Sequence, residues 1–168
     1  MPATLPSLVQ GEKTITAVPA WVERGPDGLE FTSPLEIDGV VLEALTLRGR
    51  ARKSLADREV IFQLEYHHAQ IIGGAVCRIE WRPLSAHSNK GLGPRSLRHI
   101  IQVGSHHHRF DLNWQHSQDS VLRGDLPIAV PINDDPENFR ALLAVVGKEF
   151  RIRRIQSITV PPWEPSML

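Results

Sequence analysis

Short segments in which apolar and polar residues alternate occupy most of the chain from Thr14 to about residue 130. A period of two residues is typical of a β-strand with one buried face, because successive side chains point to opposite sides of the strand. Turn sequences such as GPDG, DG and GG separate these segments. The pattern therefore predicts antiparallel strands joined by turns.

The dipeptide Asp38-Gly39, between LEI and VVLEALTLR, predicts a β-hairpin. A two-residue type I′ turn needs positive φ at both central positions, and Asp-Gly suits both. Farther along, REVIFQLEY and VCRIEWR are expected to be half-buried strands. Their buried faces are expected to hold Val60, Phe62, Leu64 and Tyr66 in the first and Cys77, Ile79 and Trp81 in the second.

A helical period appears once, in DDPENFRALLAVVG, where Phe139, Leu142, Leu143 and Val146 fall on one side. Asp134 or Asp135 suits the N-cap, and Gly147 suits the end of the helix. FRIRRIQSITV then reads as a last basic strand. We expect an α+β fold, mainly antiparallel β, made of one twisted sheet or partly open barrel with a single C-terminal helix packed against it.

The length of 168 residues suits a single domain, 1–168, with a loose N-terminal arm at 1–13 and a Pro-rich tail at 161–168. Nineteen basic residues balance nineteen acidic ones, so no global field draws the protein to polyanions. The single cysteine excludes an internal disulfide framework. No segment resembles a signal peptide or approaches about 20 apolar residues. We expect a cytoplasmic protein without a membrane partner.

The sequence VGSHHHRFDLNW holds three consecutive histidines well inside the chain. Gly104-Ser105 suits a type II′ turn, so LRHIIQV and HHHRFDLNW are expected to form a hairpin. In the register that follows, Ile101 opposes His108 and His99 opposes Phe110. This register places His99, His106 and His108 on a mainly apolar face, and it turns His107 to the polar face.

Three interpretations fit this cluster. In the first, the imidazoles are ordinary half-buried groups that hydrogen-bond to backbone or water. In the second, they perform acid–base chemistry on RNA: a neutral histidine removes a ribose 2′-OH proton and a protonated one supplies the leaving oxygen. The candidate catalytic residues are then His87, His99, His106 and His108, with no cofactor.

The third interpretation is a zinc-type site with an open position, because imidazole is the commonest metal ligand. No HExxH motif or cysteine pair accompanies the histidines, and Asp111 falls on the opposite face in the expected register. We therefore assign no metal ligands from the sequence alone.

RNA chemistry also needs fixed cations. The candidate nucleic-acid contacts are Arg82, Lys90, Arg95, Arg98, Arg151, Arg153 and Arg154. The ordinary alternative is that these are solvated surface charges. The densest basic run, RGRARK from Arg48 to Lys53, fits either a solvated strand end or a nucleic-acid contact.

Four motifs between Val60 and Ile152 carry a resemblance to a known family: RIEWRP, HSNKG, GPRSLRH and ENFRALLAVVG. In this order they resemble the TumE-like toxins of bacterial toxin–antitoxin pairs. The resemblance implies a growth-inhibiting protein that a cognate antitoxin neutralises. By position it highlights His87, Arg98 and His99, without a catalytic set to transfer.

The leading hypothesis from the sequence is a toxin-like or defence-associated protein that acts on RNA, cleaving it without metal through His99 with His106 or His108. The alternative from another class is a noncatalytic β-sheet module that binds another protein, as an inhibitor or adaptor, through a sheet edge or its Arg-rich surface. The third is a His-rich metal-binding protein.

Overall fold

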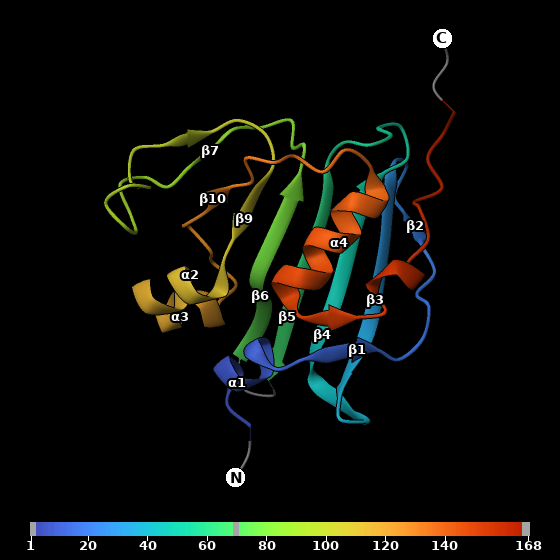
Figure 1. Cartoon of the computed structure of the whole chain (residues 1–168), viewed down its shortest axis with the longest axis horizontal. Coiled ribbons are helices and arrows are strands. Elements are labelled where there is room, and N and C mark those ends of the chain that lie inside the picture. Colours follow the sequence, from blue (N-terminus) through green and yellow to red (C-terminus); the bar gives the residue numbers. More distant parts are fainter. Residues whose placement is uncertain (1–2, 69–70, 166–168) are drawn as a thin grey trace.

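The computed structural model describes residues 3–68 and 71–165. Among these residues, nine strands form one open sheet in the order β10-β9-β6-β5-β4-β3-β1-β11, with β2 paired to β3, while β7 and β8 form a separate ribbon (Figure 1). The neighbours are antiparallel except β1 and β11. The sheet strands are β1 (Lys13–Ile15), β2 (Val22–Arg24), β3 (Gly28–Ile37), β4 (Val40–Arg52), β5 (Val60–His68), β6 (Ile71–Trp81), β9 (His106–His108), β10 (Val130–Pro131) and β11 (Ile152–Arg153). The expected α+β class is confirmed, as an open sheet.

Helix α4 (Phe139–Phe150) lies across one face of the central strands (Figure 1). It buries Phe139, Leu142, Leu143, Val146 and Phe150 against the sheet, as its period predicts. Its ends differ from the expectation. Asn138 is the N-cap in place of Asp134 or Asp135, and the helix runs past Gly147 until Arg151 adopts φ 53°.

The hairpin at Asp38-Gly39 is confirmed, with φ values of 49° and 77° at the two turn residues. The expected burial on β5 and β6 is also confirmed, since Phe62 and Trp81 are inaccessible to solvent. Cys77 is a free, buried thiol whose pKa burial raises to about 12. It behaves as a small apolar side chain.

The expectation of a loose N-terminal arm is wrong. Residues Leu5–Gln10 form helix α1, and Leu5 is buried in the core. The ammonium of Lys13 donates to the carbonyls of Val9 (2.7 Å) and Gly11 (2.6 Å), which ties the end of α1 to β1. The tail is docked as well, because the Trp163 ring lies 6.0 Å from the ring of Phe139.

The expected hairpin around Gly104-Ser105 is also wrong. Strand β8 (Ile101–Gln102) pairs with β7 (His87–Ser88), whereas β9 pairs with β6 and β10. The Ser105 hydroxyl accepts from the backbone N–H of Arg82 and donates to Asp135, which directs the chain away from β8 into β9. The expected second arm begins as β9 but ends in a short helix, α2 (Phe110–His116), and a second short helix, α3 (Gln118–Leu122), follows it.

The expected basic strand after α4 is reduced to β11, which lies parallel to β1, and the 3₁₀-helix η1 (Ile155–Ser157) follows it. None of the described helices combines the length and the apolar character that crossing a membrane requires.

Candidate metal centre

Strand β9 divides its three histidines between the two faces of the sheet. His106 lies opposite Glu80 and His108 opposite Arg78, while His107 lies opposite Ile79. The ring of His107 faces α4, 5.8 Å from the ring of Phe150. The predicted separation of His107 from His106 and His108 is therefore confirmed, although β6 and not β8 provides the register. The predicted character of the two faces is wrong: His107 lies on the apolar face that α4 covers, and His106 and His108 share the other face with Glu80 and Arg78.

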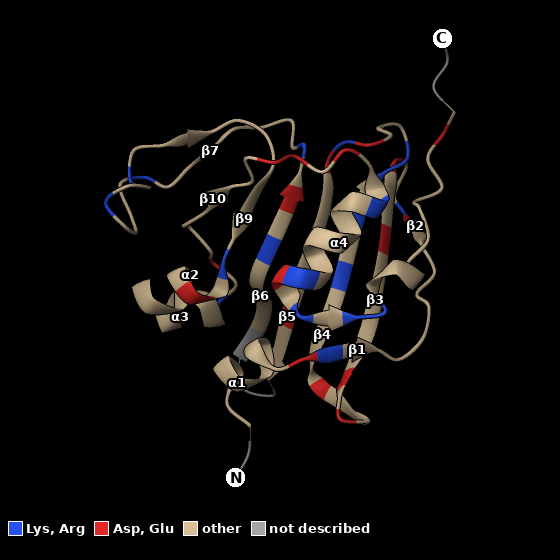
Figure 2. Cartoon of the chain, viewed as in Figure 1, with Lys and Arg blue, Asp and Glu red and all other residues tan. Residues whose placement is uncertain are grey.

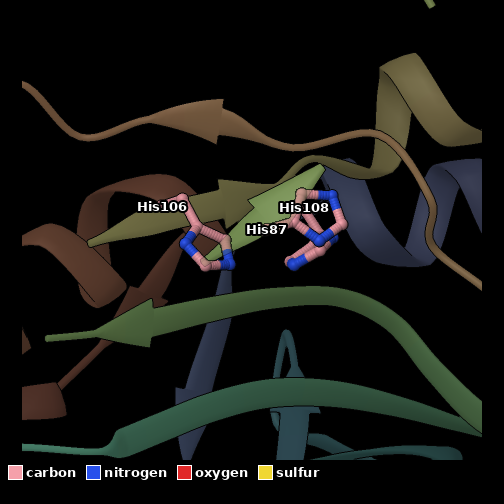
Figure 3. Close-up of side chains that lie close together, drawn as sticks. All are labelled: His87, His106 and His108. Atoms are coloured by element: carbon pink, nitrogen blue, oxygen red, sulfur yellow. The ribbon is translucent and has the colours of Figure 1, made fainter. Parts of the chain in front are cut away.

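His87 on β7 completes a cluster with His106 and His108 (Figure 3). The ring centroid of His87 lies 5.3 Å from that of His106 and 4.7 Å from that of His108, and the last two are 5.0 Å apart. One ring nitrogen from each residue lies within 4.8 Å of the other two. His106 and His108 are almost inaccessible, and His87 is half-buried.

Backbone carbonyls fix the orientation of all three rings. His87 Nε2 lies 3.0 Å from the Pro127 carbonyl oxygen. His106 Nδ1 is 2.9 Å from the Gly104 carbonyl oxygen, and His108 Nδ1 is 2.7 Å from that of Leu126. A carbonyl oxygen only accepts, so each of these nitrogens carries the hydrogen. The lone pair of a neutral ring is then on Nδ1 of His87 and on Nε2 of His106 and His108.

Glu80 faces two of these free nitrogens. Its Oε2 lies 3.6 Å from His106 Nε2, and its Oε1 lies 3.5 Å from His108 Nε2. His108 Nε2 is buried without a hydrogen-bond partner among the described residues. Since a neutral ring with Nδ1–H has no hydrogen to offer there, lone pairs and a carboxylate converge on one point. A cation at that point would satisfy all of them.

The electrostatics of the cluster agree with this arrangement. Burial alone would raise the pKa of Glu80, but the polar contact with His108 and the charges of His106, His108 and Arg78 outweigh burial and lower that pKa to about 2. Burial lowers the pKa of His87 and of His106, which favours their neutral form. An ionised carboxylate and a neutral imidazole are the forms that bind metal ions.

The spacing fits a tetrahedral ion. Zn–N bonds of about 2.0–2.1 Å place two ligand atoms roughly 3.3 Å apart. Drawing in the three ring nitrogens from their 4.8 Å limit requires side-chain movements of less than about 1 Å each. The donor set therefore suits an ion of the zinc type.

A second layer of contacts supports His87. Asn89 is fully buried, and its Oδ1 lies 3.0 Å from His87 Nε2. The same side chain accepts from the backbone N–H of Ala129 and donates to the carbonyls of Leu97 and Ala129. Asn89 thus holds the loop that carries β7 against residues 127–129, and so places the His87 ring.

The structure separates His99 from the other candidate catalytic residues. His99 is exposed in the turn that precedes β8, and the cluster consists of His87, His106 and His108. The expected pairing of His99 with Phe110 fails because β8 and β9 are not neighbours.

The candidate nucleic-acid contacts do not gather around the cluster. Lys90, Arg95 and Arg98 lie in the exposed loop between β7 and β8. Arg82 is paired with Asp135 at 2.8 Å and covers the Trp81 ring. Arg151 follows α4 and lines a hollow with His107, on the face of β9 opposite His106 and His108, and Arg153 and Arg154 come after it at β11. Figure 2 shows the Lys and Arg positions spread over separate parts of the fold.

Sequence reasoning missed Glu80 and Asn89. Glu80 was expected on the solvent side of its strand, which is correct, but nothing local shows that β9 turns two histidines toward the same side. For Asn89, the one signal in the sequence was its position two residues after the candidate His87. Comparisons with protein-family models, with curated proteins and with solved structures give no significant match for the chain.

Proposed function

We propose that this protein binds one divalent transition-metal ion through His87, His106 and His108, with Glu80 as the facing carboxylate. The observation that carries the proposal is the orientation of the rings. His106 and His108 each donate Nδ1–H to a backbone carbonyl and direct Nε2 toward Glu80, and one ring nitrogen of His87 lies within 4.8 Å of a ring nitrogen of each. Metal-binding histidines commonly have this outer hydrogen bond, which sets the tautomer and the ring orientation.

The centre is suited to activate water. Three histidines leave room for exchangeable ligands on the ion, and a zinc-bound water has a pKa near 7. The side chain of Glu80 is 21% exposed and lines a hollow in the sheet face, so the ion is reached from the Glu80 side. Metal-dependent hydrolysis is therefore the chemistry we assign to this site, in place of metal-independent cleavage by His99 with His106 or His108.

Titration calorimetry with zinc chloride on untagged protein tests the proposal. One ion is expected to bind, and His87→Gln is expected to weaken binding by more than about 100-fold, since even outer-sphere changes cost 10–100-fold. His99→Gln is the matched control, because His99 is an exposed histidine outside the cluster. Equal losses in the two variants, or no saturable binding, would contradict the proposal.

Action on RNA, a toxin-like role, an antitoxin partner and a cytoplasmic location stay predictions. They rest on the resemblance and on composition. Incubation with a mixed RNA pool, with and without EDTA, separates the two mechanisms. Cleavage that survives EDTA and disappears in His99→Gln would favour the metal-independent nuclease over the metal centre.

A further inference from the structure

A hollow of about 220 Å³ lies on the sheet face that carries Glu80, His106 and His108. Its walls come from β4, β5, β6, Glu59 just before β5 and Pro83 just after β6, and they include Arg50, Ile61 and Glu80. Because Glu80 contacts two imidazoles and also lines the hollow, a molecule in this hollow is adjacent to the ion that the cluster would bind.

One row of cross-strand neighbours connects the hollow to the cluster. Arg50 lies opposite Ile61, Ile61 opposite Glu80, and Glu80 opposite His106. With strands about 4.8 Å apart, Arg50 lies roughly 10 Å from Glu80 and roughly 14 Å from His106, measured between backbones. Side chains reduce these separations, so a small molecule can contact both Arg50 and the metal centre.

Arg50 differs from its neighbouring arginines because they are all paired. Arg48 contacts Glu65 at 2.8 Å and Glu30 at 3.1 Å. Arg52 contacts Asp27 at 3.0 Å and Glu59 at 3.4 Å, and Arg78 contacts Gln63 at 3.1 Å and Glu80 at 3.7 Å. Within the described part of the chain, Arg50 has neither an ion pair nor a side-chain hydrogen bond, and it is exposed.

Charges of both signs lie near Arg50, because Arg52, Glu59 and Glu80 line the same hollow. A divalent ion bound beside Glu80 would more than neutralise that carboxylate, and Glu59, which also lines the hollow, is already paired with Arg52. A guanidinium binds a carboxylate or phosphoryl group through two parallel hydrogen bonds.

We propose that this hollow binds the oxyanion of a small-molecule substrate of the metal centre, and that Arg50 holds that oxyanion. The inference rests on the proposed function. A polyanion fits less well, because it would also meet the carboxylates of Glu30, Glu59 and Glu65 on the same part of the sheet.

The test is titration calorimetry of inorganic phosphate and, separately, of acetate into the zinc-loaded and the zinc-free protein. We expect saturable binding of at least one anion to the zinc-loaded protein, and a loss of about tenfold in Arg50→Gln from the missing charge-assisted hydrogen bonds. Arg24→Gln is the control: its exposed guanidinium lies 3.9 Å from Glu30, and it does not line the hollow. The control is expected to stay within about twofold of wild type, and zinc affinity is expected to be unchanged in Arg50→Gln.

Failure of this inference can be told from failure of the metal centre. Normal zinc binding with equal anion affinity in wild type and Arg50→Gln would overturn the inference and leave the metal centre standing. Anion binding that depends on Arg50 in a protein that takes up no zinc would overturn both the metal centre and the link of the hollow to it. Anion binding that depends on Arg50 and becomes tighter when zinc is bound supports the inference. Whichever of phosphate and acetate binds with the higher affinity identifies the chemical group.

Discussion

The two faces of β9 hold the same residue type in different environments. On the α4 face, His107 packs beside Phe150, its Nε2 is buried without a partner among the described residues, and its Nδ1 is 3.7 Å from Glu149. Burial, helped by the charges of Arg109 and His108, lowers the pKa of His107 to about 3. On the other face, His106 and His108 each donate to a carbonyl and direct a free nitrogen toward Glu80.

This difference shows that neighbours decide what a histidine can do. His107 is a neutral, bulky side chain that fills space under a helix. His106 and His108 have their rings fixed by backbone, a carboxylate in front of them and a third imidazole within reach. Burial is almost equal on the two faces, so burial alone does not distinguish a ligand from a core residue.

The largest difference in zinc affinity is expected between alanine variants on the two faces of β9. His108→Ala removes a ligand and is expected to weaken zinc binding by more than about 100-fold. His107→Ala removes a similarly buried ring from the opposite face and is expected to change zinc affinity by less than about threefold. Calorimetry on both variants measures this ratio, and comparable losses would break the distinction between the faces.

Neutralising Glu80 is expected to have the next largest effect. Glu80→Gln keeps the shape of the side chain but removes the charge that faces the ion, so zinc affinity should fall by about tenfold. Glu59→Gln is the matched control, because Glu59 lines the same hollow but pairs with Arg52 instead of facing the imidazoles. A larger loss of zinc affinity in Glu59→Gln than in Glu80→Gln would show that Glu80 is not part of the metal centre.

Asn89→Ala tests the support of His87. Losing buried hydrogen bonds is expected to lower the free energy of unfolding by about 1–3 kcal/mol. Zinc affinity is expected to fall by up to about tenfold because the His87 ring loses one of its two acceptors. Asn113→Ala is the control, since Asn113 is equally buried and bonds the backbone of Arg109 and Ile128 instead. In urea unfolding, Asn113→Ala should lower the free energy of unfolding by a similar amount, but its zinc affinity should stay closer to wild type. A greater loss of zinc affinity in Asn113→Ala than in Asn89→Ala would count against the role of Asn89.

The smallest effect is expected for leucine in place of His107, measured by urea unfolding in EDTA. His107→Leu removes a nitrogen that already lacks a partner, so the free energy of unfolding should change by less than about 1 kcal/mol. His108→Leu leaves the carbonyl of Leu126 without its donor and should cost about 1–3 kcal/mol. A greater loss at His107 would show that its polar atoms matter more than its packing.

The period-two pattern predicted the sheet, and the reason lies in the strand itself. Side-chain alternation belongs to each strand whatever its neighbour, so the separation of His106 and His108 from His107 was predicted correctly. Which face is apolar depends on the partner strand and on α4, and that assignment was reversed. The Asp38-Gly39 turn was predictable for the same local reason.

The features that depend on contacts between residues far apart in the sequence could not be predicted. Phe110, Leu112 and Trp114 alternate like a strand, but Phe110 and Trp114 also fit a helical turn, where their rings stack at 5.2 Å. Asn113 stabilises that turn by bonding Ile128, a contact that the local sequence does not reveal. His87 was a candidate from the sequence, but its place beside His106 and His108, with Glu80 facing them, follows from the pairing of β7 with β8 and of β9 with β6.

Anomalous diffraction at the zinc edge, from crystals of the untagged protein grown with zinc, tests the central claim most directly. The account predicts one peak between the three rings, about 2.0–2.1 Å from Nδ1 of His87 and from Nε2 of His106 and His108. A cluster without a peak, or a peak bonded to the nitrogens that contact the backbone carbonyls, would contradict it.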